Sequence, residues 1–308
     1  MSISPKLIGL VILMCAAAVA VSAADTQPVQ TVKDLYPRLP TGALLYARLK
    51  DLPAGVVLES GGVKITPNDL NERIREAPKE LWPQMKRNLF FVLEDVASKT
   101  FLTYEANEWA KRNQQAASAA GNDIVAAYLI SVAGELSVSD DEAKSYFDAN
   151  KDATGEAAFD QVKDQLKQFL LDQKRQDAIK VYVAGTGQRY EINVNETWVA
   201  KQNSAAMDNP VDKARKSGKP TMIDFGADGC KPCDMMAPLL ASLQTDYAGK
   251  ANVLFVHVRK EQVLGARYGI EVIPVQVFFD KDGKEVFRHA GFYPKDQIVA
   301  KLVEMGVK

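Results

Sequence analysis

The chain has 308 residues, of which 47% are hydrophobic and 25% are charged, a composition that is ordinary for soluble globular protein. Its formal net charge of −1 gives no reason to expect nucleic acid or an anionic membrane surface as a partner. The length is sufficient for about two domains, each with its own hydrophobic core. Composition therefore indicates only a soluble globular protein, and the function has to be inferred from sequence motifs.

The N-terminus has the pattern of an export signal. Lys6 precedes an apolar run over residues 7–21, and small residues lead to a cleavage position after Ala24. Cys15 follows larger apolar residues and lacks the small residue that a lipoprotein cleavage site has just before its cysteine. Residues 1–24 are therefore interpreted as a cleaved signal peptide, with a retained membrane anchor as the alternative.

Residues 25–198 are predicted to form a mostly helical module. Residues 56–65 are typical of a small hairpin that turns at two glycines. Thr66 and Pro67 then have the chemistry of a helix start, as cap and first helical position. A short alternating strand is expected near the end of the module, at residues 189–195. Helical patterns lie between, over residues 85–113, 124–133, 139–151 and 159–183.

Residues 199–209 are interpreted as a linker, and the pattern changes from residue 210 onward. Helical and apolar extended segments now alternate, ending with two strands that flank the turn at Asp282 and Gly283. This order predicts an α/β domain over residues 210–308, with a mixed central sheet flanked by helices. Its expected strands are residues 220–227, 252–258, 275–280 and 285–291.

Cys230 and Cys233 are the two cysteines that remain once the signal peptide is removed. A zinc site needs four ligands, and the mature chain has no second cysteine pair. Its two histidines, His257 and His289, lie inside predicted strands. A loop this short restricts the unfolded chain little, so a purely structural bridge is disfavoured. A redox pair is the favoured interpretation, and no metal is expected.

The predicted position of the pair explains how it would react. Cys230 lies where a strand meets a helix, so its sulfur faces unpaired N–H groups and the positive end of the helix dipole. Both favour the thiolate, as does the charge of Lys231. Cys233, one turn into the helix, is expected to be buried and to act as the resolving thiol, while Pro232 stiffens the turn.

Residues 210–308 resemble thioredoxin over essentially the whole length of that family. Asp224, six residues before the first cysteine, matches the family's buried acid, and Pro238 matches the proline that kinks its active-site helix. The sequence "YGIEVIP" ends at Pro274, which matches the family's cis-proline, and Gly291 matches a glycine that lets a substrate backbone approach. The resemblance implies a thioredoxin fold with a redox-active disulfide and no other cofactor.

The same resemblance implies roles for the surrounding residues. Asp224 is expected to exchange a proton with Cys233 when that thiol attacks the mixed disulfide. The backbone at Ile273, Pro274 and Gly291 is expected to bind substrate, and Lys231 and Pro232 are grouped with it as substrate contacts.

Three positions depart from the family. Gly229 and Gly226 stand where thioredoxins have tryptophans, so the surface beside the sulfurs is expected to be flatter and more open. Phe255 replaces the lysine that pairs with the buried acid. Without that cation, Asp224 is expected to be more desolvated, and desolvation raises the pKa of a carboxyl group.

Residues 56–198 resemble the chaperone part of SurA-like periplasmic proteins, through "LESGGVKITPNDL", "SVSDDEAKSYFDANK" and the closing "YEINVN". That family carries a prolyl isomerase domain, for which residues 150–159 leave no room. The likeness therefore implies a peptide-binding module without isomerase activity, in a periplasmic protein. Tethering such a module to a redox centre raises the effective concentration of a bound client to roughly millimolar for a short linker.

The favoured interpretation is a periplasmic disulfide reductase that acts on clients held by the helical module. Proline before the second cysteine and Ile273 before the cis-proline are typical of reductants in this family. Its partners would be proteins with disulfides or free cysteines, and a membrane thiol relay as electron donor. A disulfide isomerase with chaperone activity is the first alternative, and a redox-inactive or redox-switched chaperone the second. The oligomeric state is left open.

Overall fold

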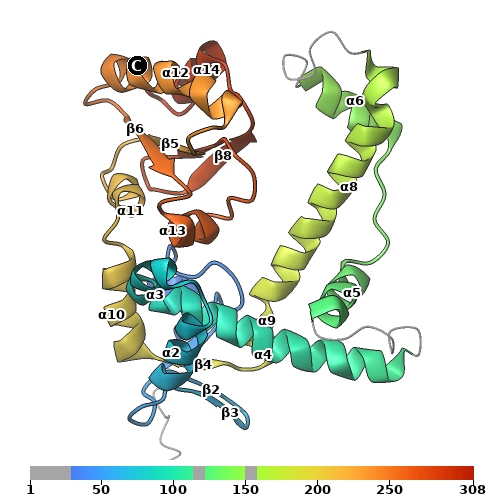
Figure 1. Ribbon diagram of the computed structural model, residues 1–308, viewed down its shortest axis with the longest axis vertical. Helices are drawn as coiled ribbons and strands as arrows, with labels where there is room; N and C mark the ends of the chain where they lie inside the picture. Colours follow the sequence, from blue (N-terminus) through green and yellow to red (C-terminus); the bar gives the residue numbers. More distant parts are fainter. Residues whose placement is uncertain (1–28, 114–121, 150–157) are drawn as a thin grey trace, which may run out of the picture.

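The computed structural model describes residues 29–113, 122–149 and 158–308 of the chain (Figure 1). The predicted signal peptide, with Cys15, lies outside these residues. None of the helices in the described ranges is long and apolar enough to cross a bilayer. The chain forms an N-terminal base, a helical arm that rises from one end of it, and a C-terminal α/β domain above its other end in this view.

The base combines a small sheet with helices. The predicted hairpin is present as β2 (Leu58–Ser60) and β3 (Val63–Ile65), and the sheet order is β1-β4-β2-β3. At the start of α2, Thr66 is the N-cap and Pro67 the first helical residue, as expected, and the N–H and hydroxyl of Thr66 donate to Asp69 Oδ2 at 2.6 and 2.8 Å. The other elements are α1 (Val32–Leu35), β1 (Arg48–Lys50), α2 (Pro67–Arg75), η1 (Lys79–Leu81), α3 (Trp82–Arg87), α4 (Leu89–Arg112), β4 (Asn193–Asn195) and α10 (Glu196–Ala206).

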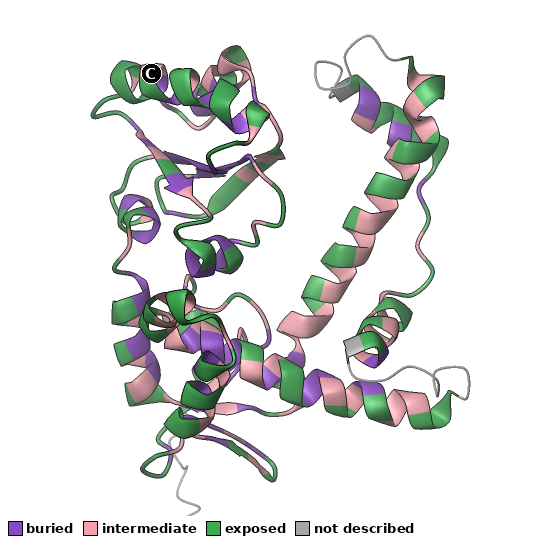
Figure 2. Ribbon diagram, in the orientation of Figure 1, coloured by how far each residue is buried: buried purple, intermediate pink, exposed green. Residues whose placement is uncertain are grey.

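The arm consists of α5 (Asn122–Ala133), α6 (Asp140–Ala149), α8 (Phe159–Ala184) and the short α9 (Thr186–Arg189). The main core cluster of the base draws on residues of the base alone, among them Leu58, Phe90, Phe101 and Val194. The long helix α8 has no buried residue, and Figure 2 shows it as exposed and intermediate along its length. The predicted mostly helical module is thus confirmed, and its arm is much less tightly packed than its base.

A buried carboxylate fixes the first loop of the base to α4. Both oxygens of Glu94, a fully buried side chain, accept hydrogen bonds from the loop that precedes β1. The donors are the backbone N–H and hydroxyl of Thr41, at 2.7 and 2.8 Å, and the N–H groups of Gly42 and Leu44, at 3.0 and 3.2 Å. Burial raises the pKa of this carboxyl group, and the hydrogen bonds from Thr41, Gly42 and Leu44 act in the opposite direction.

We expect Glu94→Gln to lower the free energy of unfolding by about 2–3 kcal/mol, because the new amide group turns donors toward N–H groups that are buried. Denaturant unfolding followed by circular dichroism measures this. Asp95→Asn is the matched control, since the neighbouring Asp95 is exposed and pairs with Arg73 at the surface. That pair should contribute less than about 1 kcal/mol. Equal effects of the two substitutions would contradict the anchoring role of Glu94.

The C-terminal domain has the predicted α/β architecture. Its sheet has the order β6-β5-β7-β8, with β5 and β6 parallel and the other pairs antiparallel, so the sheet is mixed as expected. One face packs on α12 and α14 and the other on α11 and α13. The elements are α11 (Pro210–Arg215), β5 (Thr221–Gly226), α12 (Lys231–Asp246), β6 (Asn252–His257), α13 (Gln262–Arg267), β7 (Val275–Phe279), β8 (Glu285–Ala290) and α14 (Lys295–Glu304).

The segment expected to be a linker, residues 199–209, is mostly helical. Residues 199–206 belong to α10, and Val199 and Ala206 are buried in the core of the base. Asn209 then caps α11 by accepting a hydrogen bond from the N–H of Asp212 at 3.0 Å. Apolar side chains in this segment find a core to pack on, which composition alone does not reveal.

Direct contacts also join the base to the C-terminal domain. The Gln84 side chain of α3 donates to the carbonyl of Lys260 at 2.8 Å and accepts from the N–H of Val263 at 3.1 Å. Arg267 of α13 donates to Asn88 at 3.2 Å. The two modules are therefore joined at a defined interface between α3 and α13.

Candidate functional site

The two cysteines form a disulfide at the N-terminus of α12. The chain leaves β5, turns at Gly229 with a positive φ of 72°, and enters the helix at Cys230, its N-cap. The N–H of Cys233 points at the Cys230 sulfur, at 3.4 Å. Cys230 is half-buried and Cys233 is buried, so an incoming group meets the first sulfur. The same N–H would stabilise a Cys230 thiolate after reduction.

A backbone loop faces this sulfur. The Ile273–Pro274 peptide bond is cis, and the carbonyl oxygen of Ile273 lies 3.9 Å from Cys230 Sγ. Gly291, with a φ of 103°, donates its N–H to the carbonyl of Pro274 at 2.8 Å. The structure thus brings together Cys230, Ile273, Pro274 and Gly291. Lys231 is exposed and Pro232 half-buried in the first turn of α12.

Asp224 lies below the disulfide, in the middle of the sheet. Its side chain is fully buried, and its strand neighbours are Phe255 on β6 and Gln276 on β7. Burial raises the pKa of this carboxyl group to about 6, although a hydrogen bond from Gln276 acts in the opposite direction. Its oxygen Oδ2 has no hydrogen-bond partner within the described residues.

Gly226 lies between Cys233, Asp224 and Phe255. A β-carbon placed on this glycine would lie 3.4 Å from Cys233 Sγ, 3.5 Å from Asp224 Oδ2 and 2.9 Å from a ring carbon of Phe255. The surface was expected to be flatter and more open here, because the tryptophan of thioredoxins is absent. The Phe255 ring reaches over from β6 to this β-carbon position, and Phe255 itself is 45% exposed.

Gln276 is the residue of this site that sequence reasoning missed. It lies on β7, whose other residues are valine and phenylalanine, and it is fully buried. Its amide nitrogen donates to Asp224 Oδ1 at 2.7 Å. A single polar residue inside an apolar strand, two positions after Pro274, was the available signal, since buried amides need partners.

We expect Asp224→Asn to stabilise the protein at pH 7 and to have little effect at pH 4. The unfolded carboxyl group ionises near its ordinary value of 3.8, but the folded one ionises near 6. The unfolded state therefore gains its charge first as pH rises, and the folded protein loses stability across that interval. At about 1.4 kcal/mol per unit, the penalty above pH 6 is about 3 kcal/mol.

Urea unfolding at pH 4, 5, 6, 7 and 8 tests this expectation. Asp234→Asn serves as the control, because Asp234 is an exposed carboxylate in the first turn of α12. A constant difference between Asp224→Asn and the natural protein across this pH range would contradict the buried, late-ionising carboxyl group.

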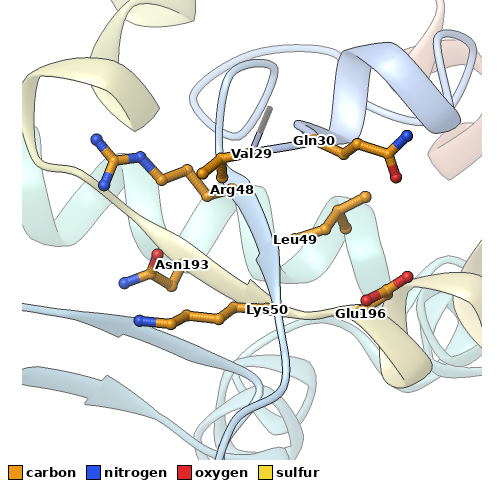
Figure 3. Close-up of a pocket in the computed structure, with 7 residues that line it drawn as sticks. All are labelled: Val29, Gln30, Arg48, Leu49, Lys50, Asn193 and Glu196. Atoms are coloured by element: carbon orange, nitrogen blue, oxygen red, sulfur yellow. The ribbon is translucent and has the colours of Figure 1, made fainter. Parts of the chain in front are cut away.

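Of three hollows on the described part of the N-terminal module, the two largest are lined by different elements. One, of about 470 Å³, is formed by the start of the described chain, β1, β4 and the first residue of α10 (Figure 3). Its lining residues are Val29, Gln30, Arg48, Leu49, Lys50, Asn193 and Glu196. The other, of about 530 Å³, is a groove between α6 and α8 that Val138, Tyr146 and Leu170 help to line.

The site geometry defines a thioredoxin-fold domain whose disulfide is positioned for thiol–disulfide exchange. A family profile described as a thioredoxin-like domain matches residues 207–306. Thioredoxin of Staphylococcus aureus is 35% identical over 104 residues, which cover 34% of this chain and 94% of that protein. The chain belongs to the thioredoxin family, through its C-terminal third.

Solved structures of thioredoxins are similar as well. A thioredoxin from Nicotiana alata is 24% identical, with a TM-score of 0.28, and the match covers 31% of this chain and 80% of that one. A mutant thioredoxin from Halobacterium salinarum NRC-1 is 28% identical, with a TM-score of 0.28 and coverage of 32% and 83%.

Proposed function

We propose that this protein is a periplasmic protein-disulfide reductase that acts on clients held by its N-terminal module. The observation that carries the proposal is the disulfide at the start of α12, with its first sulfur 3.9 Å from the carbonyl of Ile273. An extended substrate chain lying along the Ile273–Pro274 backbone would have its own disulfide next to Cys230. The reaction needs no cofactor beyond this pair.

In the reduced protein, the Cys230 thiolate attacks a client disulfide, and one client sulfur leaves as a thiolate that takes up a proton. A mixed disulfide now joins Cys230 to the client. Asp224, in its ionised form, accepts the proton of Cys233, and the resulting thiolate attacks Cys230 Sγ. The second client sulfur leaves and is protonated. Two electrons have passed from the cysteine pair to the client, and the internal disulfide has formed.

The direction of the reaction is supported by residues beside the sulfurs. Pro232 before the second cysteine and Ile273 before the cis-proline are the features of reductants in the resemblance given above. An exported reductant must be reduced again after each cycle, and a membrane thiol relay would supply the electrons. The signal-peptide pattern of residues 1–24 supports the periplasmic location.

The arm supports the holding role. Its helices expose apolar side chains, including Ile130, Phe169 and Val181, and a groove of about 530 Å³ runs between α6 and α8. Exposed apolar surface of this kind suits unfolded or partly folded chain. Among the aromatic residues of α4, Phe90 and Phe101 are buried in the base, whereas Tyr104 is exposed.

The reduction potential of the Cys230–Cys233 pair tests the proposal. The mature protein is equilibrated with dithiothreitol buffers of known ratio, and free thiols are counted by alkylation and mass spectrometry. A value near about −270 mV supports a reductant, whereas a value near about −180 mV or higher overturns it in favour of an isomerase or oxidant.

A further inference from the structure

We propose that Gln276 is a positioning residue of the redox site: its amide holds Asp224 so that the free carboxyl oxygen faces Cys233. The inference rests on the proposed function and names a residue outside the disulfide and its substrate loop. Its side chain bonds to Asp224, and it acts through that carboxyl group.

The two carboxylate oxygens of Asp224 differ in their hydrogen bonding. Oδ1 is occupied by the Gln276 amide at 2.7 Å, whereas Oδ2 has no partner within the described residues. Oδ2 borders the same point above Gly226 as Cys233 Sγ. A carboxylate held by one oxygen thus presents the other to the resolving thiol, directly or through one water molecule, as a general base requires.

Packing alone does not account for Gln276. It is fully buried in an apolar strand, and its own carbonyl oxygen, Oε1, lacks a partner within the described residues. A buried amide with an unsatisfied oxygen destabilises a fold relative to an apolar side chain of similar size. Among the residues that the structure describes, the hydrogen bond of this amide goes to Asp224.

The Gln276 amide is the polar group that most affects the pKa of Asp224. Burial raises the pKa of Asp224, and the hydrogen bond from Gln276 lowers it. On β6, Phe255 lies beside Asp224, and the next side chain on that face, His257, pairs with Asp228. The titratable group from α12 is Cys233, and that from β8 is His289, which lies opposite Gln276 and contacts the carbonyl of Phe292.

A pH profile of disulfide reduction tests the role of Gln276. The reduced protein is mixed with a fluorogenic peptide disulfide between pH 4.5 and 8.5, and the rate is measured by stopped flow. The rate of the natural protein should rise with pH in a limb centred near pH 6, where Asp224 becomes ionised. Gln276→Met removes the donor at similar volume, so this limb should move up by about one to two pH units, as loss of a hydrogen bond to a charged group predicts. Gln276→Leu is the second variant, should methionine prevent folding.

A double-mutant cycle separates positioning from packing. In the Asp224→Asn background the limb should be absent, and Gln276→Met should change the rate less than twofold. An unmoved limb in folded Gln276→Met, or equal rate losses in both backgrounds, would overturn the inference. Loss of all reduction by the natural protein would overturn the proposed function instead. In that case, ¹³C NMR titration of the Asp224 carboxyl carbon still tests Gln276, whose substitution should raise the midpoint.

Discussion

Cys233→Ser should turn the protein into a trap that stays covalently attached to its clients. Cys230 can still attack a client disulfide, but the neighbouring thiol that would release the adduct is gone. Intramolecular attack by well-placed groups corresponds to effective molarities of about 10⁵ M or more. Millimolar external thiol cannot match this, so we expect turnover to fall at least about a thousandfold. Non-reducing electrophoresis and intact-mass spectrometry of the purified variant measure the adducts.

Cys230→Ser is the matched control for the trap. Cys233 is buried, whereas Cys230 is the sulfur beside the Ile273 carbonyl, so the control variant should form no adduct. Adducts of equal amount with both variants would mean that the buried sulfur also reacts with clients. Adducts with Cys230→Ser alone would reverse the roles of the two cysteines.

Asp212→Asn should destabilise the C-terminal domain by about 3–5 kcal/mol, the usual effect of breaking a buried ion pair. Asp212 is fully buried and pairs with Arg215 and Arg267, both at 3.4 Å. Its oxygens also accept hydrogen bonds from the hydroxyl of Tyr268 at 2.9 Å and the amide of Asn209 at 2.6 Å. Neutralising the carboxylate leaves the buried Arg267 without its counter-ion.

Thermal and urea unfolding of the full chain measure this loss. Asp208→Asn is the control, because Asp208 pairs with Lys213 on the surface and both side chains are largely exposed. The control should change stability by less than about 1 kcal/mol. Similar effects of the two substitutions would show that the network around Asp212 adds nothing beyond a surface pair.

The helices and strands of the C-terminal domain could be predicted from short sequence patterns. The apolar runs of β5, β6 and β7 are bounded by clear turn signals, and the cysteine motif fixes where α12 begins. The base was harder, because β1 has three residues and pairs with β4 far along the chain. Such a short strand has no periodicity of its own and forms only because a partner strand supplies the hydrogen bonds.

The site was predictable wherever a residue type fixes the chemistry, as for Cys230, Cys233 and Asp224. Two features depended on contacts across the sheet instead. The Phe255 ring covers Gly226 from the neighbouring strand, and Gln276 reaches Asp224 from the opposite one. Both require the strand register, which brings residues about 30 and 50 positions apart side by side, and no local pattern reports it.

If the arm holds clients as proposed, the interface between α3 and α13 makes spacing along the client sequence a selection rule. With α10 folded and Gln84 and Arg267 bonded across the interface, the disulfide is held at a constant distance from the base. The arm is in turn bonded to the base through Arg189 of α9 and Glu105 of α4. A client segment bound to the arm reaches the sulfurs only through its own extended chain, at most about 3.3–3.6 Å per residue. Cysteines close to the bound segment would fall short. The molecule would then act as a ruler, choosing disulfides by their position in the client rather than by the residues around them.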